Sequence, residues 1–168
     1  MGQFSSNNLK KFAILDRDGT LIEETNDERI DSLEKLKLLP NMVSSLRQLK
    51  ELGFTLVMAT NQYDLGTKKF PVAKFEKPQN HLLSTLEKEG ITFEEIFICP
   101  HGKYSKCNCK KPKLGMLPHN FIKKIDQSSS IMVGDRRSDQ IFAKRLGIKG
   151  IKISKKNGWK EIINKLTK

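Results

Sequence analysis

FAILDRDGT, residues 12–20, is an apolar run that stops at two aspartates, a glycine and a threonine. Four consecutive apolar residues are too few for a helix and are typical of a buried strand in a parallel sheet. Ligands of open α/β sheets bind beyond the carboxyl ends of the strands, where Asp16 and Asp18 would lie on the same side. Two carboxylates this close repel each other unless a cation or a shared proton relieves them. The stretch therefore favours a divalent metal beside a nucleophile and a proton donor; the alternative is a solvated Asp-Gly turn.

A second apolar run ends in the same way, at Asp135. A parallel sheet would bring this carboxylate to the same edge as the first pair, where it could complete a metal site. Between the two runs, another apolar segment leads into Thr60 and Asn61, and Lys110 and Lys111 supply cations further along. In chain order the polar groups are two carboxylates, a hydroxyl with an amide, a lysine and another carboxylate.

Four motifs of these types in this order resemble the haloacid dehalogenase superfamily of phosphohydrolases, and the resemblance spans nearly the whole chain. It implies that Asp16 attacks phosphorus to form an aspartyl-phosphate, while Asp18 protonates the leaving alkoxide and later takes a proton from water. It also implies a magnesium ion held by Asp16, the backbone carbonyl of Asp18, and Asp135. The residues expected to hold the substrate phosphate are Thr60, Asn61, Lys110 and Lys111.

Strand-like and helix-like segments alternate along the chain. The strands are expected near Ala13, Val57, Phe97, Met132 and Ile151, and helices over roughly 42–52, 80–89, 114–124, 138–146 and 159–166. Alternation of this kind predicts right-handed crossovers and an α/β fold. We expect a three-layer, doubly wound, mainly parallel sheet of the Rossmann-like type found in the haloacid dehalogenase superfamily.

The chain of 168 residues is expected to form a single phosphatase domain, residues 1–168, with residues 1–10 as a flexible lead-in. Many members of the superfamily insert a folded cap domain, but neither gap between the motifs is long enough for one. No apolar stretch approaches the roughly 20 residues of a transmembrane helix, and residues 1–11 lack the apolar core of a signal peptide. We therefore expect an uncapped enzyme of the cytoplasm, with no membrane partner.

The net charge of +12 invites a nucleic-acid interpretation. However, the lysines are scattered from Lys10 to Lys168, and only 7% of the residues are aromatic. A lysine-rich solvated surface explains this distribution better than a nucleic-acid footprint does. A basic surface would still help to attract a small anionic substrate, so we expect a small phosphorylated metabolite as the partner.

All three cysteines lie in one short window, residues 99–109, together with a histidine. An odd number of cysteines argues against a disulfide framework, and free thiols are the remaining alternative to a metal site. The loop is polar and has little apolar surface to fix its shape, so a metal bound here would be structural. Because the loop leads directly into Lys111, loss of the metal should still lower activity. The four donors match the Cys₃His ligand set of a closed structural zinc site, and they are Cys99, His101, Cys107 and Cys109.

A cysteine–histidine loop that runs into Cys-x-Cys-basic-Lys-Pro-Lys is similar to a small, uncapped branch of the superfamily. Within that branch the chain most resembles the histidinol-phosphate phosphatase domain of histidine biosynthesis. The resemblance implies magnesium-dependent hydrolysis of L-histidinol phosphate. It rests on DRDGTLI at 16–22, TNQ at 60–62, LGT at 65–67, ICPH at 98–101 and GDR at 134–136.

Two residue positions depart from that family pattern. Tyr63 and Asp64 stand where the family has an Asp-Gly pair, and Lys110 stands where arginine is common. The lysine keeps the charge but loses the bidentate phosphate fork of arginine. Three other functions stay open: a heptose bisphosphate phosphatase of surface-sugar synthesis with the same chemistry, a polynucleotide 3′-phosphatase, which the net charge allows, and, last, a binding module without enzymatic activity.

Histidinol phosphate carries a cationic amine and an imidazole, so acidic side chains near the first motif are candidate contacts. Glu23 and Glu24 could meet the ammonium group, and Arg17 is expected near the entrance; exposed acids on a loop are the alternative. In some bacteria the phosphatase domain is fused to a dehydratase of the same pathway. A fusion to such a dehydratase, or an association with one, is therefore an expected partner relationship.

Overall fold

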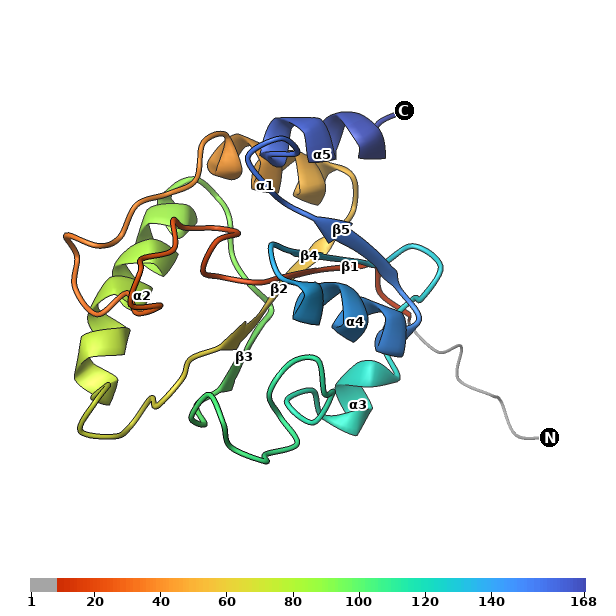
Figure 1. The fold of residues 1–168 in the computed structure, drawn as a ribbon. Helices are drawn as coiled ribbons and strands as arrows, with labels where there is room; N and C mark the ends of the chain where they lie inside the picture. Colours follow the sequence, from red (N-terminus) through yellow and green to blue (C-terminus); the bar gives the residue numbers. More distant parts are fainter. Residues whose placement is uncertain (1–8) are drawn as a thin grey trace.

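The computed structural model describes residues 9–168. Its centre is a five-stranded sheet in the order β3-β2-β1-β4-β5 (Figure 1). All four neighbouring pairs of strands are parallel, which confirms the predicted α/β fold. The strands are β1 (Phe12–Leu15), β2 (Thr55–Asn61), β3 (Glu95–Cys99), β4 (Ile131–Gly134) and β5 (Lys149–Lys152).

Helices cover both faces of the sheet. Because side chains alternate along a strand, Ala13 and Leu15 of β1 join one core, and Phe12 and Ile14 join the other. The first core is closed by α1, α2 and α5, and the second by α3 and α4. Figure 1 shows α1 and α5 side by side and α4 against β4 and β5. The helices are α1 (Met42–Glu51), α2 (Val72–Lys88), α3 (His119–Ile122), α4 (Arg137–Leu146) and α5 (Trp159–Leu166).

Two predicted helices have the wrong bounds, and a proline accounts for each. Helix α2 begins at Val72, directly after Pro71, rather than near residue 80, and it carries Pro78 in its interior. Interior prolines usually interrupt a helix, so the sequence favoured a start beyond Pro78. The helix predicted over 114–124 is a single turn, His119–Ile122. Pro118 has an extended backbone conformation, so the helix cannot include Pro118 or the residues before it.

The start of the described chain is tied to the fold. The amide of Lys10 donates to the carbonyl of Lys124 at 2.7 Å, and the carbonyl of Lys10 accepts from the amide of Asp126 at 2.9 Å. The expected flexible lead-in, residues 1–10, therefore does not include Lys10. Residues 1–8 lie outside the described residues.

The long connections of the sheet lie at its carboxyl edge. Residues 16–41 follow β1 and residues 100–118 follow β3, and neither segment contains a helix or a named strand. Within residues 9–168, no connection folds into a cap domain, as predicted. None of the described helices combines the length and apolarity needed to cross a membrane.

Candidate active site

Register places the polar ends of three strands together. Leu15 of β1 pairs with Met58 of β2 and with Val133 of β4, so the residues that follow these positions meet at one edge of the sheet. Asp16 is only 6% exposed, and the side chain of Asp18, which precedes Gly19, is only 15% exposed, so the alternative of a solvated Asp-Gly turn is wrong. Carboxylate oxygens of Asp16, Asp135 and Asp139 lie within 4.8 Å of one another.

The turn after β1 is packed tightly against this carboxylate cluster. Gly19 has a φ of +75°, and a Cβ at this position would lie 2.5 Å from Oδ2 of Asp135. Only glycine combines that backbone conformation with so close an approach. The glycine of the DRDGT motif thus brings the first motif against the carboxylate after β4.

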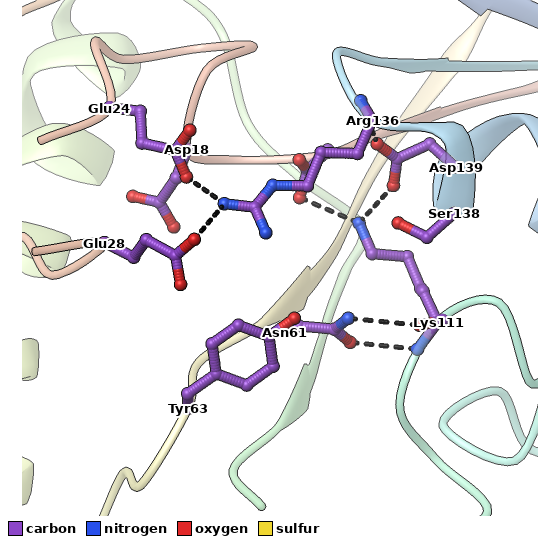
Figure 2. Close-up of a pocket in the computed structure, with 10 residues that line it drawn as sticks. Asp18, Glu24, Glu28, Asn61, Tyr63, Lys111, Arg136, Ser138 and Asp139 are labelled. Carbon is purple, nitrogen blue, oxygen red and sulfur yellow. Dashed lines mark hydrogen bonds and ion pairs between the residues drawn. The ribbon is translucent and has the colours of Figure 1, made fainter. Parts of the chain in front are cut away.

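Lys111 is the cation inside the cluster. Its side chain is 2% exposed, and Nζ lies 2.8 Å from Oδ1 of Asp16 and 2.7 Å from Oδ1 of Asp139 (Figure 2). Burial alone would lower the pKa of Lys111, but the two carboxylates outweigh it and raise that pKa. Asn61 fixes the backbone here: its Oδ1 accepts from the Lys111 amide at 3.0 Å, and its Nδ2 donates to the Lys111 carbonyl at 3.3 Å.

Asp139 belongs to the site; the sequence offered two roles for it, a carboxylate at the start of a helix, which was favoured, or a group that orients the metal. Its Oδ2 accepts from the amide of Arg136 at 3.0 Å, at the start of α4, while Oδ1 accepts from Lys111. Burial and then the charge of Asp16 raise the pKa of Asp139. One carboxylate therefore both caps a helix and holds the site lysine. Its position four residues after Asp135, at the beginning of a helix, was the available signal.

The carboxylates fit a hard divalent cation. Oδ1 of Asp135 is buried and has no hydrogen-bond partner among the described residues. Burial, followed by the charges of Asp16 and Asp139, raises the pKa of Asp135 to about 7. Lys111 satisfies the other two carboxylates, so Asp135 is left without a cation, and oxygen donors of this kind suit magnesium. The contribution of the Asp18 carbonyl stays a prediction.

Asp18 lies in the same pocket but holds different partners. Its Oδ1 accepts from Nη1 of Arg17 at 2.7 Å, and its Oδ2 accepts from Nε2 of Gln62 at 2.6 Å. Burial, with a contribution from Asp16, raises the pKa of Asp18 above its ordinary value, although Arg17 and Gln62 oppose the shift. A carboxyl group that binds a proton more readily than usual is suited to act as an acid.

Residues from three loops form the mouth of the pocket. Arg136 extends across it and donates through Nη2 to Glu24 and, at 3.3 Å, to Glu28 (Figure 2). Glu28, Tyr63, Arg136 and Ser138 were not predicted as site residues. The pocket is lined by Asp16, Asp18, Glu24, Glu28, Asn61, Tyr63, Lys111, Arg136, Ser138 and Asp139.

Several predicted contacts lie elsewhere. Arg17 is fully buried instead of standing at the entrance, and Glu23 is exposed and does not line the pocket. Nζ of Lys110 donates to the carbonyls of the cysteine loop, the shortest bond being 2.5 Å to Lys103, so this lysine braces the loop rather than facing the pocket. Thr60 is buried and does not line the pocket either; its Oγ1 accepts from Nε2 of Gln62 at 2.9 Å.

The cysteine loop brings its four predicted ligands together. The donor atoms of Cys99, His101, Cys107 and Cys109 all lie within 4.8 Å of one another. Sγ of Cys109 lies 3.0 Å from Sγ of Cys99 and 3.0 Å from Nδ1 of His101. None of the three cysteines, all within the described residues, forms a disulfide. This donor set, soft sulfur with one imidazole, fits a structural zinc ion.

Comparisons with known proteins agree with this architecture. The family described as polynucleotide kinase 3 phosphatase matches residues 11–158. The chain is 42% identical over 163 residues to the histidine biosynthesis bifunctional protein HisB of Buchnera aphidicola, covering 95% of this chain and 46% of that protein. It is 44% identical over 160 residues to HisB of Campylobacter jejuni, covering 94% of this chain and 45% of that protein. The chain thus spans less than half the length of these relatives.

A solved structure shows the same fold. The D,D-heptose 1,7-bisphosphate phosphatase of B. bronchiseptica, crystallised with magnesium and phosphate, matches with a TM-score of 0.79 and 24% identity. The alignment covers 94% of this chain and 98% of that one. At this identity the similarity establishes the fold alone.

We expect Asp135→Asn to stabilise the metal-free protein at alkaline pH. The pKa of Asp135 is raised from 3.8 to about 7 in the folded state, so its contribution to stability is present at acid pH and is lost as pH rises toward 7 and above. Asparagine cannot ionise and avoids this loss. In the presence of a chelator, thermal unfolding should show that the free energy of unfolding of Asp135→Asn exceeds that of the unchanged chain by about 2 kcal/mol near pH 8, and by less near pH 5.

Magnesium is the control for this prediction. The cation should stabilise the unchanged chain most near pH 8 and should have little effect on Asp135→Asn. Parallel stability curves for the two proteins, with and without magnesium, would contradict the assignment of Asp135 as a cation ligand.

Proposed function

Since the chain belongs to the polynucleotide kinase 3 phosphatase family of haloacid dehalogenase-like phosphatases, we propose that it hydrolyses a phosphate monoester and that the substrate is L-histidinol phosphate. The observation that carries the reaction is the buried pairing of Asp16 with Lys111 at 2.8 Å, with the carboxyl of Asp18 in the same pocket. These residues supply a nucleophile, a cation and an acid around one point.

The reaction has two steps on these residues. An oxygen of Asp16 attacks phosphorus in line; the bond from phosphorus to the leaving oxygen breaks, and protonated Asp18 gives that oxygen its proton. Water then attacks the aspartyl-phosphate, Asp18 takes a proton from that water, and inorganic phosphate leaves with Asp16 restored. Positioning and charge neutralisation supply most of the catalysis in phosphoryl transfer.

Lys111 and the divalent site neutralise the phosphate. In the free protein Lys111 is paired with Asp16 and Asp139; we infer that its ammonium group moves onto a phosphate oxygen when the substrate binds. Asp16 and Asp135 are the side chains that would hold magnesium, which when bound offsets the charge of the phosphate oxygens. Asp139 keeps Lys111 beside the nucleophile throughout.

The choice of substrate rests on the relatives and on the charges of the pocket mouth. The two HisB proteins named above, of histidine biosynthesis, are 42% and 44% identical to the chain. Of the ten lining residues five are acidic and two are basic, so a phosphate group would add charge to an already negative pocket. A leaving group with a positive charge, such as the amine of histidinol, would offset Glu24 and Glu28.

Two further features belong to the same proposal. We infer that the four donors of the cysteine loop hold zinc, which would fix the loop that ends at Lys111. We also infer that the phosphatase works beside a second activity, because relatives that are named bifunctional are about twice as long as this chain. A dehydratase of the same pathway is the expected second activity.

A comparison of substrates tests the proposed function. We expect kcat/KM for L-histidinol phosphate to exceed that for heptose 1,7-bisphosphate and for a 3′-phosphorylated oligonucleotide by at least about 100-fold, with magnesium present. Asp16→Asn is the control: its turnover should fall below about a hundredth of the original, since the nucleophile is lost. Preference for either of the other phosphates would replace the proposed substrate and leave the reaction class intact.

Substitutions at the pocket mouth test the charge argument. We expect the double variant Glu24→Gln, Glu28→Gln to raise KM for L-histidinol phosphate about fivefold, because a charge pair of this kind contributes about 1 kcal/mol. KM for glycerol 2-phosphate, an ester without a cation, should change less than about twofold. Glu23→Gln is the matched control, being exposed and outside the pocket. Equal changes for both substrates would contradict the role of Glu24 and Glu28.

Elemental analysis tests the zinc site. We expect about one zinc ion per chain, retained in Tyr104→Phe and lost in Cys109→Ser. Tyr104 lies in the same loop with 91% of its surface exposed, so its substitution controls for general effects on the loop. Loss of zinc should lower turnover even at saturating magnesium, since the loop positions Lys111. If Cys109→Ser kept the same zinc content as the unchanged chain, the assignment of Cys109 as a zinc ligand would be wrong.

A further inference from the structure

We propose that Arg17 is a positioning residue: together with Gln62 it fixes the carboxyl group of Asp18 toward the leaving group, and helix α2 sets its place through Gln79. The inference rests on the proposed function, because it assigns a cause to the acid role of Asp18. It replaces the expectation that Arg17 contacts the substrate.

Arg17 is a fully buried cation with specific partners. It is 0% exposed; Nη1 donates to Oδ1 of Asp18 at 2.7 Å, and Nε donates to Oε1 of Gln79 at 2.8 Å. Its guanidinium group lies 5.1 Å from the ring centroid of Phe75. A buried ion pair is weak support for stability, because desolvation offsets much of the attraction, and apolar residues of similar volume often serve a core as well. The contact with Asp18 is therefore the feature that needs an explanation.

The two oxygens of Asp18 are held separately. Oδ1 accepts from Arg17, and Oδ2 accepts from Nε2 of Gln62 at 2.6 Å. The second hydrogen of that Nε2 is directed to Oγ1 of Thr60 at 2.9 Å, so the Gln62 amide is itself fixed. Each carboxyl oxygen has about two lone-pair positions, and one on each stays available for a proton. Rotation of the carboxyl group would break both bonds, so its plane is defined before substrate binds.

Helix α2 sets the place of Arg17 without lining the pocket. Gln79 is 5% exposed and Phe75 is 4% exposed, and both belong to α2. Nε2 of Gln79 also faces Sδ of Met58 in β2, at 3.6 Å. The side chain that accepts from Arg17 is thus confined between the helix and the sheet. A helix outside the pocket thereby fixes the orientation of the acid through one arginine.

The leaving group distinguishes this role from a purely structural one. An alkyl phosphate needs a proton on its poor alkoxide leaving group, whereas p-nitrophenyl phosphate releases a stable phenolate without one. Rapid-mixing measurements of aspartyl-phosphate formation isolate the step in which Asp18 donates. Arg17→Met keeps an apolar chain in the core but removes both hydrogen bonds, and Gln79→Leu removes only the acceptor from α2.

We expect Arg17→Met to slow aspartyl-phosphate formation from L-histidinol phosphate by about 10- to 100-fold, part of the roughly 10²- to 10⁴-fold that a general acid contributes. Formation from p-nitrophenyl phosphate should slow less than about threefold. Gln79→Leu should show the same selectivity with a smaller effect, and it serves if Arg17→Met does not fold. Leu86→Ala is the matched control: it is buried on α2 two turns away, so it lowers the melting temperature without selectivity between the substrates.

Asp18→Asn separates the two ways in which the inference could fail. If Asp18→Asn slows only the alkyl substrate while Arg17→Met and Gln79→Leu slow both substrates equally or neither, the positioning role of Arg17 is wrong and the proposed function stands. If Asp18→Asn itself slows both substrates equally, the acid assignment of the proposed function is wrong, and the role of Arg17 is lost with it.

Discussion

The crowding of carboxylates at the end of β1 is the constraint on which the rest of the structure depends. Oxygens of Asp16, Asp135 and Asp139 lie within 4.8 Å of one another in a largely buried place, and like charges so close cannot all stay ionised without cations. The buried Lys111 forms ion pairs with Asp16 and Asp139, and Oδ1 of Asp135 has no hydrogen-bond partner among the described residues. The geometry around the site follows from this need: Asn61 clamps the backbone of Lys111, and a glycine lets the first motif approach Asp135.

Much of the fold could be predicted because its signals are local. Apolar runs followed by polar residues identified β1, β2 and β4, and the parallel pairing of β1 with β4 brought Asp16 and Asp135 together as expected. The bounds of α2 could not be predicted in the same way, because a proline such as Pro78 usually ends a helix. Here Pro78 lies in the middle of α2 and its side chain is buried, so tertiary packing outweighs that local preference. The short α3 is limited in turn by Pro118, at its first boundary.

The site residues likewise differ in whether a local sequence pattern predicts them. The proposed nucleophile Asp16, the proposed acid Asp18 and Lys111 follow from motif order. In contrast, Arg136 and Glu24 meet across 112 positions of the sequence, and no local pattern indicates such a contact. Arg17 was misplaced for a different reason. The sequence prediction placed it with its neighbours Asp16 and Asp18, which do line the pocket. The side chain of Arg17 instead points away from the pocket and into the core. There it meets Gln79 of α2 and is fully buried.

The two arginines near the pocket, Arg17 and Arg136, differ in burial and in how firmly their partners hold them. Arg17 is buried beneath the acid, and its bonds can be lost only at the cost of leaving polar groups unpaired in the core. Arg136 lies at the mouth, where it and Lys103 share Glu28 in ion pairs with side chains 32% to 53% exposed. Exposed pairs of this kind contribute about 0 to 1 kcal/mol, so the charged leaving group proposed above would replace Arg136 at little cost. The groups proposed for the chemistry are therefore fixed by burial, while the groups proposed to select the substrate are held in weaker, more exposed ion pairs.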